Sequence, residues 1–359
     1  MNDQELAAWL RLTLIPGLGG ETQRRLLKAF RDPEAIFAAP LSALGGVVEG
    51  ALARRLLEHE CKAEIEAALE WAARPGNQLL TLADAAYPQA LFSIPDPPVL
   101  LYAKGNVALL NRPAFAIVGS RNATKQGEAN AEAFAQALAA AGLTIVSGMA
   151  TGCDAAAHRG ALKEVASTIA VIGTGCDRIY PASNEHLARA IAEQGCIVSE
   201  FPLGTPPIAA NFPRRNRLIA GLGRGCLVVE AAKHSGSLIT ARLAAEAGRE
   251  VFAIPGSIHS PQSKGCHALI KQGAKLVETA QDILEELCWE AAAPPPPQAP
   301  EQADEVDPIL IALGGDPCDL DTLAARTGLT ADALLSRLLT LELEGRVAQL
   351  PGGRYQRLA

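Results

Sequence analysis

Residues 115–122 read Phe115-Ala116-Ile117-Val118-Gly119-Ser120-Arg121-Asn122. Four apolar residues followed by a Gly-Ser turn are typical of a buried strand that leads into a helix, here expected over residues 128–141. The turn exposes backbone N–H groups, and the helix start adds positive potential. Arg121 adds a guanidinium suited to phosphate, although a solvated arginine on a plain surface loop is the alternative. The stretch predicts α/β structure with an anion site beyond the strand.

The same pattern recurs along the chain. Further strands are expected at residues 144–147, 168–172, 196–199, 226–229, 251–254 and, at an edge, 275–277. Helices are expected at residues 155–163, 183–193, 237–247 and 268–272. Continuous apolar strands alternating with helices predict a parallel sheet covered on both faces, with ligands at the carboxyl ends of the strands. The uncharged residues 133–153 are broken by Gly142 and are interpreted as α/β core, not as a membrane span.

The chain of 359 residues divides into four predicted segments. Residues 1–85 form a helical unit similar to SAM or helix-hairpin-helix domains. Its turn Ile15-Pro16-Gly17-Leu18-Gly19-Gly20 either offers N–H groups to a DNA phosphate or simply joins two helices. Residues 86–290 form an extended Rossmann-like domain, and residues 291–303 form a Pro-rich linker. Residues 304–359 form a winged helix, with helices at 306–313, 319–327 and 330–344 before a two-stranded wing.

The charge is unevenly distributed. The formal net charge is −7, from 32 basic and 39 acidic residues, but twelve acids fall in residues 276–325, which contain no Lys or Arg. Residues 97–127, 201–229 and 251–277 contain no acid at all, so the local field predicts a basic face. We hypothesise that the acidic window competes with nucleic acid for this face; a solvated helix end plus linker is the alternative. The winged helix has five Arg against nine acids, which favours partner contact or regulation at least as much as DNA binding.

Two other glycine-rich loops follow predicted strands. Gly148-Met149-Ala150 follows residues 144–147, and its small residues allow close backbone approach. Gly173-Thr174-Gly175 starts like a dinucleotide-binding GxGxxG, but its sixth position is Arg178 and it does not follow the first strand, so no nicotinamide cofactor is expected. His158 has no nucleophile at a defined spacing, so we do not interpret it as catalytic.

Residues 211–217 read Asn211-Phe212-Pro213-Arg214-Arg215-Asn216-Arg217. Three arginines within four residues predict a polyanion contact, and Phe212 beside them could stack on an unpaired base. Core packing of Phe212 and a solvated arginine face are the alternatives. Ser235-Gly236-Ser237 opens another helix and could hold a phosphate, and Lys264 adds a cation after the next strand.

Eight cysteines are present, and their spacing matches no zinc motif. The acidic start Met1-Asn2-Asp3-Gln4-Glu5 does not resemble a signal peptide. We therefore expect reduced thiols, a cytoplasmic location and no metal or cofactor.

Taken in order, these motifs resemble the DNA-processing protein A (DprA/Smf) family. The resemblance covers about residues 85–290 and rests on Gly119-Ser120-Arg121, residues 147–158, Asn216-Arg217 with the flanking arginines, Ser235-Gly236-Ser237 and Pro255-Gly256. It implies a homodimeric single-stranded DNA-binding protein that protects incoming strands and helps load the RecA recombinase in natural transformation. It further implies that Arg121 and the arginines at 214–217 hold phosphates, with Phe212 near a base.

The expected function is therefore non-enzymatic. A rival comes from cytokinin-activating phosphoribohydrolases, which share a related sheet and use a Pro-Gly-Gly-x-Gly-Thr-x-x-Glu motif. This chain instead has Glu230-Ala231-Ala232-Lys233-His234-Ser235-Gly236-Ser237, without the Gly-Gly pair or the later Glu, which weakens the hydrolase alternative.

Overall fold

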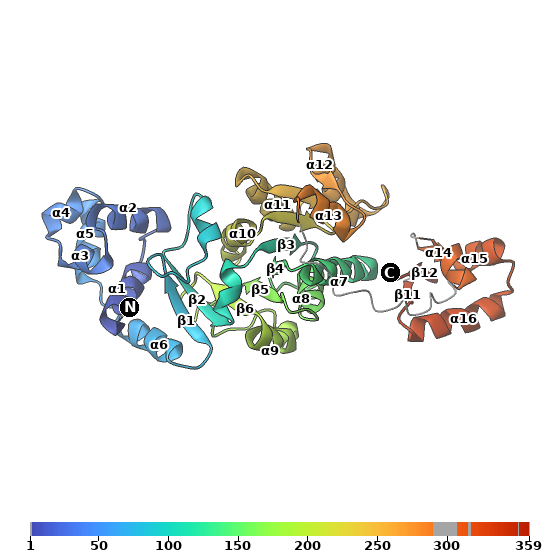
Figure 1. Ribbon diagram of the computed structural model, residues 1–359, viewed down its shortest axis with the longest axis horizontal. Helices are drawn as coiled ribbons and strands as arrows, with labels where there is room; N and C mark the ends of the chain where they lie inside the picture. The colour runs from blue at the N-terminus through green and yellow to red at the C-terminus, as the bar shows by residue number, and fades with distance from the viewer. Residues whose placement is uncertain (1, 290–306, 315–316, 351, 359) are drawn as a thin grey trace.

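A computed structural model describes residues 2–289, 307–314, 317–350 and 352–358. Figure 1 shows a helical unit, a central sheet domain and a winged helix. The expected linker, residues 291–303, lies outside the described residues, as does the central part of the acidic window. None of the described helices combines the length and the hydropathy needed to cross a bilayer.

The N-terminal unit is helical, as predicted. It contains α1 (Asp3–Leu14), α2 (Gly20–Phe30), α3 (Pro33–Ala38), α4 (Leu41–Gly45), α5 (Gly50–Glu58) and α6 (Lys62–Ala72). Buried leucines such as Leu26 and Leu56 form its own core, whereas Trp9 and Trp71 pack with Tyr102 of the sheet. The glycine turn before α2 is held by α5, because Arg55 Nη1 donates to the Pro16 carbonyl at 2.8 Å.

The central sheet has nine strands in the order β1-β2-β6-β5-β4-β3-β7-β8-β9. The strands from β6 to β9 are parallel, whereas β1 pairs antiparallel with β2, and β2 with β6. The strands are β1 (Asn77–Thr81), β2 (Leu100–Gly105), β3 (Ala114–Val118), β4 (Thr144–Ser147), β5 (Thr168–Val171), β6 (Cys196–Ser199), β7 (Gly225–Val228), β8 (Glu250–Ala253) and β9 (Lys275–Leu276). The predicted parallel sheet is confirmed. β1 and β2 were not predicted, and β1 begins inside the segment 1–85.

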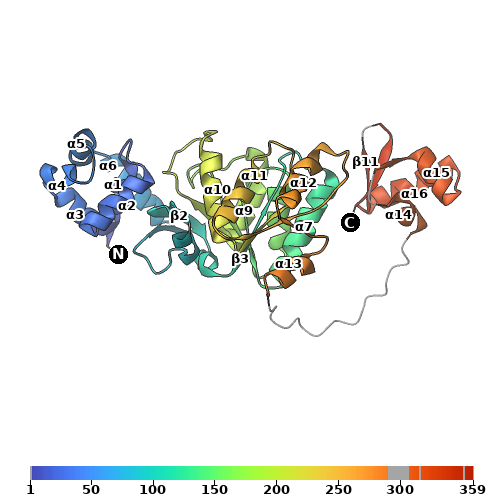
Figure 2. The same ribbon diagram turned by 90° about the horizontal axis from the view of Figure 1, so that it is seen from above.

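Helices cover both faces of the sheet (Figures 1 and 2). One face carries α7 (Lys125–Ala140), α8 (Cys153–Ala161), α9 (Glu185–Gln194) and α13 (Ala280–Glu286). The other carries α10 (Asn211–Leu222), α11 (Ser237–Glu246) and α12 (Lys264–Lys271). The 3-10 turns are η1 (Gln89–Ser93), η2 (Val107–Asn111), η3 (Ala182–Asn184) and η4 (Pro261–Ser263). Residues 133–153 span α7, β4 and the start of α8, so they belong to the α/β core as expected.

The C-terminal unit has the predicted winged-helix order. Its elements are α14 (Pro308–Leu313), β10 (Cys318–Asp319), α15 (Leu320–Thr327), α16 (Ala331–Leu343), β11 (Val347–Leu350) and β12 (Arg354–Arg357). Asp319 caps α15, as its side chain accepts from the Thr322 N–H at 2.8 Å. Leu323, Leu338 and Tyr355 are among the residues that close a separate small core.

Candidate functional site

The strand order reverses between β3 and β7, because β4 lies on one side of β3 and β7 on the other. In open α/β sheets, ligands bind beyond the carboxyl ends of the strands at such a switch point. A cavity of about 730 Å³ lies there, which we call the switch-point cleft. Loops after β3, β4, β5 and β7 line it, together with the first turns of α10. Several of the loops predicted to form the site therefore lie together at this edge of the sheet.

The loop after β3 forms one wall. Gly119 has no room for a side chain, since an added Cβ would lie 2.4 Å from Cys153 Sγ. The Ser120 hydroxyl accepts from the Asn122 N–H at 3.1 Å, which fixes the turn. Arg121 is exposed and its Cζ lies 5.4 Å from the centre of the Phe212 ring. A cation over an aromatic face in a cleft suits a single-stranded nucleic acid, which carries both phosphates and unpaired bases.

Residues 211–217, for which no helix was predicted, form the start of α10. Helical spacing places Phe212, Arg215, Asn216 and Ile219 on the side that lines the cleft. Pro213 is tolerated because it falls in the first turn, where its missing N–H has no helical partner. The helix therefore separates arginines that are neighbours in the sequence, and only Arg215 of the three lines the cleft.

Arg215 is a buried cation, with only 4% of its surface exposed. Its Nη1 donates to the Gly148 carbonyl at 2.6 Å and also to the Val171 carbonyl, joining the ends of β4 and β5. Burial lowers the pKa of Arg215 to about 10, and burial raises the pKa of the nearby Asp154 carboxyl while Arg215 opposes that shift. Arg215 therefore holds the floor of the cleft together and contributes positive potential from below.

Arg214 and Arg217 point toward an acidic partner outside the cleft. Both donate to Glu200 Oε2, Arg214 at 3.1 Å and Arg217 at 2.5 Å, and the Glu200 side chain is only 2% exposed. Arg217 Nε also lies 3.3 Å from Asp96, whose other oxygen pairs with Arg24 of α2 at 2.5 Å. Arg217 thus belongs to an ion-pair network between the sheet domain and the helical unit.

The start of α11 also lines the cleft. Gly236 caps this helix without a side-chain hydrogen bond, and the first turn has no acidic residue. The hydroxyls of Ser235 and Ser237 lie 2.7 Å apart and face the cleft, and the Gly236 carbonyl accepts from Asn216 Nδ2 at 3.3 Å. The first N–H groups of α11 are already used, because Ser237 donates to the Ser235 hydroxyl at 3.4 Å, and Leu238 and Ile239 donate to the carbonyls of Ser235 and Gly236. The hydroxyls and the positive end of the helix dipole are therefore what this part of the cleft offers to an anion.

The start of α7 is closed by the protein itself. The Glu230 carboxylate accepts from the Thr124 N–H at 2.9 Å and from the Thr124 hydroxyl at 2.6 Å. An added Cβ on Gly127 would lie 2.4 Å from the Glu230 carboxyl carbon. A dinucleotide-binding domain places its pyrophosphate at this helix start. A carboxylate in that place is incompatible with that binding mode.

Six other predicted residues follow β4, β5 and β8, and five of them do not line the cleft. Gly148 and Met149 support the loop after β4, and Ala150 lines the cleft itself. Gly173 lies under Phe212, where an added Cβ would be 3.0 Å from the ring, and Gly175 packs against the Pro202 carbonyl. Lys264 stands outside the cleft and donates to the Ile258 carbonyl. The two glycines of the false dinucleotide motif thus provide space for neighbouring segments.

His158 and the thiols are internal. His158 Nδ1 lies 2.7 Å from the Thr168 hydroxyl, which itself donates to the Ile145 carbonyl, so Nδ1 carries the proton. Burial lowers the pKa of His158 to about 3, so the ring is neutral near pH 7. All eight cysteines are free. The described residues contain no group of three or more side chains able to hold a metal.

The sequence analysis missed several residues that line the cleft: Asn122, Tyr180, Lys233, His234 and Gln262. Tyr180 is 44% exposed, and its ring lies 5.6 Å from that of Phe212. Lys233 and His234 directly precede Ser235 in the loop after β7, and this position could have identified them as residues of the cleft. Tyr180 gave none, because it lies well beyond the end of its strand.

Comparisons with known proteins agree with this geometry. Residues 78–288 match the family model of DNA recombination-mediator protein A, and residues 293–353 match the DprA winged helix domain. Protein Smf of Escherichia coli is 42% identical, covering 100% of this chain and 96% of the relative. The solved DNA processing protein A of Streptococcus pneumoniae has a TM-score of 0.69 at 39% identity, over 80% of this chain and 98% of that chain. That of Helicobacter pylori, described by its single-stranded DNA binding mode, has a TM-score of 0.54 at 33% identity, over 59% and 96%.

Proposed function

Because the chain belongs to the DNA recombination-mediator protein A family, we propose that it binds single-stranded DNA in the switch-point cleft. One observation carries the proposal: exposed Arg121 lies over Phe212 in the same cleft that the hydroxyls of Ser235 and Ser237 line at the start of α11. The cleft offers a stacking surface and an anion-binding surface to the same strand. The proposed contacts are to phosphates and to the faces of bases, which carry little sequence information, so binding is largely independent of sequence.

The residues take distinct parts in this proposal. Arg121 and Lys233 contact phosphates, with the hydroxyls of Ser235 and Ser237 beside them. Phe212 and Tyr180 stack on bases. Arg215 contributes positive potential from the floor of the cleft. Arg214 contacts the DNA only at the edge of the cleft, since its side chain is 52% exposed but paired with Glu200.

We extend the proposal to the protein's role in the cell. In the cytoplasm a homodimer protects incoming single strands and helps load RecA onto them during natural transformation, without a catalytic step. The family membership supports this extension, together with the buried, neutral state of His158. Strand exchange by RecA on DNA pre-coated with single-strand-binding protein tests the loading step, because the protein should shorten the lag. Light scattering of the full chain tests the homodimer.

Fluorescence anisotropy with labelled single-stranded and duplex oligonucleotides across a salt series tests the binding step. Neutralising about four phosphates gives a log–log salt slope of about −3 for a single strand, and Arg121→Ala should reduce its magnitude by about 0.7. Arg54→Ala, an exposed arginine on α5, is the matched control and should leave the slope unchanged. Absence of low-salt binding by the folded protein would overturn the proposal.

A further inference from the structure

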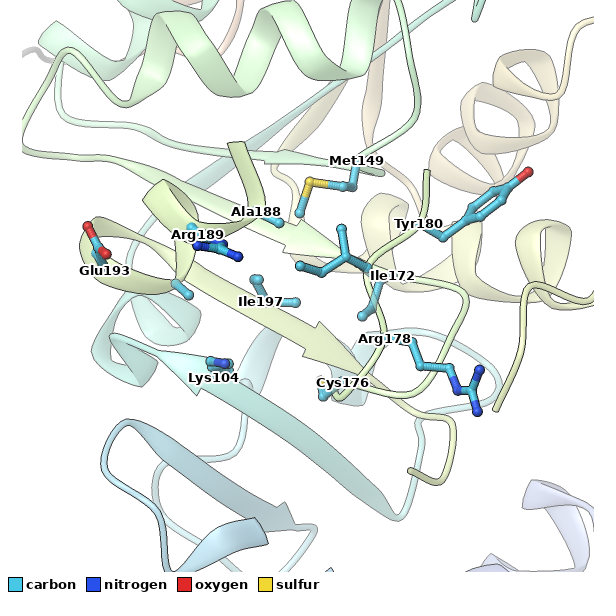
Figure 3. A pocket seen from close by; sticks show the side chains of 12 residues that line it. Lys104, Met149, Ile172, Cys176, Arg178, Tyr180, Ala188, Arg189, Glu193 and Ile197 are labelled. Atoms are coloured by element: carbon cyan, nitrogen blue, oxygen red, sulfur yellow. The ribbon is translucent and has the colours of Figure 1, made fainter. Parts of the chain in front are cut away.

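A second cavity of about 270 Å³ lies beside the switch-point cleft, on the α9 face of the sheet. We call it the side pocket (Figure 3). Its walls are mostly apolar and include Met149, Ile172, Ala188, Ala192 and Ile197. Figure 3 shows Met149 and Ile172 pointing toward one another in the middle, with Tyr180 and Arg178 at one end and Glu193 at the other. Its mostly apolar lining suits an aromatic ring more than a charged group.

The side pocket adjoins the cleft. Tyr180 lines both cavities. The loop after β4 lies between them, since Met149 lines the pocket and Ala150 lines the cleft. Met149 has a φ of 61°, a left-handed conformation that is uncommon for a residue with a side chain. Asn184 Nδ2 holds this turn by donating to the Met149 carbonyl at 2.9 Å, so the loop presents opposite sides to two adjoining spaces.

Charge at the edge of the pocket is mostly positive. Arg178 is exposed, and neither Arg178 nor Lys104 forms an ion pair among the residues that the structure describes. Arg189 is paired with Glu185 on its own helix, and Glu193 is the one carboxylate of the lining. An apolar interior with free cations at its edge matches a base attached to a sugar–phosphate chain.

We propose that the side pocket takes one unpaired base of the strand whose backbone lies in the switch-point cleft. The base stacks against Tyr180 and enters between Met149 and α9, and Arg178 contacts the phosphate beside it. This inference rests on the proposed function, because without a strand in the cleft no base is delivered to Tyr180. It predicts that some of the affinity depends on bases and is independent of the backbone contacts.

Filling the pocket from α9 tests this inference without altering the cleft. Ala192 lines the side pocket and is absent from the cleft, so Ala192→Phe blocks the pocket alone. Ala190→Phe is the matched control, since Ala190 lies on the same helix but lines neither cavity. Affinities are measured for oligo-dT and for an abasic oligonucleotide of equal length. Ala192→Phe should weaken oligo-dT binding at least about fivefold, the lower end for one stacked base, and leave abasic binding unchanged.

A second measurement needs no variant. Oligo-dT carrying 5-iododeoxyuridine is cross-linked to the full chain by light, and the attached peptides are mapped. A cross-link to Met149, which faces only the side pocket, supports the inference; cross-links confined to the cleft peptides around Phe212 overturn it.

The outcomes are separable. If the wild type binds both oligonucleotides but Ala192→Phe weakens both equally or neither, the side-pocket inference fails and the proposed function stands. Loss of binding in Ala190→Phe to the same degree also counts against the pocket. If the folded wild type binds neither oligonucleotide, the proposed function itself fails, and the inference with it.

Discussion

Glu230 holds Thr124 at the start of α7, accepting one hydrogen bond from its backbone and one from its hydroxyl. The carboxylate lies where a dinucleotide-binding domain would bind a phosphate, and its negative charge compensates the positive end of the helix dipole. Gly127 is required beside it because any side chain there would meet the carboxylate.

Gly127→Ala should therefore lower the free energy of unfolding by about 1–3 kcal/mol, since the added Cβ forces the carboxylate to move. In the double variant Gly127→Ala/Glu230→Ala the loss should be smaller than the sum of the single losses. Urea unfolding of all three variants measures the coupling. Gly50→Ala is the control, because an added Cβ there meets nothing within 4 Å. Additive losses would show that the two residues do not interact.

Phe212 and Arg121 should give different signatures in binding. Phe212→Ala removes a stacking surface and no charge, so affinity for single-stranded DNA should fall by about 1–3 kcal/mol with an unchanged salt slope. Arg121→Ala should reduce both the affinity and the slope. Anisotropy titrations at several salt concentrations separate the two effects. A changed slope in Phe212→Ala would argue against a stacking role.

The two arginines that share Glu200 should differ in their effect on stability. The Arg217 side chain is only 13% exposed and contacts two carboxylates, so Arg217→Ala should cost about 3–5 kcal/mol by leaving Glu200 buried with less compensation. Arg214→Ala should cost less than about 1 kcal/mol, because this side chain is half exposed. Urea midpoints of the two variants, each the other's control, check this. Equal losses would contradict the assignment of Arg217 to the ion-pair network.

The buried histidine makes the fold sensitive to acid. The pKa of His158 is about 3 in the folded protein, below its unfolded value, so between about pH 6.5 and 3 the unfolded chain binds an extra proton. Stability therefore falls as the pH drops through this window, whereas the raised pKa values of Asp154 and Glu200 act in the opposite direction.

Replacing His158 should flatten this dependence. Between pH 7 and pH 5 the histidine accounts for about 2 kcal/mol of lost stability, and His158→Gln should remove that part. Urea unfolding at both pH values measures it, with exposed His186→Gln as the control. An unchanged pH dependence in His158→Gln would show that another group is responsible.

The acidic window can be tested by deletion. If residues 276–325 compete with DNA for the basic face, removing residues 291–359 should tighten single-stranded DNA binding, most strongly at low salt. Anisotropy compares the shortened and full chains after circular dichroism has confirmed the fold. Equal affinities would dispose of the competition hypothesis.

Most of the sheet could be predicted, because buried parallel strands are continuous apolar runs and their loops collect at one edge. β1 and β2 were missed although residues 99–103 are an apolar run, because this antiparallel pair, which joins the sheet through β2 and β6, does not follow the alternation of strands and helices. α10 was missed because Pro213 and the arginines conceal its apolar period. Once these residues are helical, adjacent side chains point about 100° apart. That rotation sends Arg215 toward the cleft and Arg214 and Arg217 toward Glu200.

The two-sided character of α10 has a mechanical consequence. Phe212 lies on the cleft side of this helix, and Arg217 on the other side is linked through Asp96 to Arg24 of the helical unit. A helix of twelve residues is a rod about 18 Å long that shifts as one piece. We therefore expect a displacement of the helical unit to act on Phe212 through α10, and a displacement of Phe212 by bound DNA to act on the ion pairs between the two units.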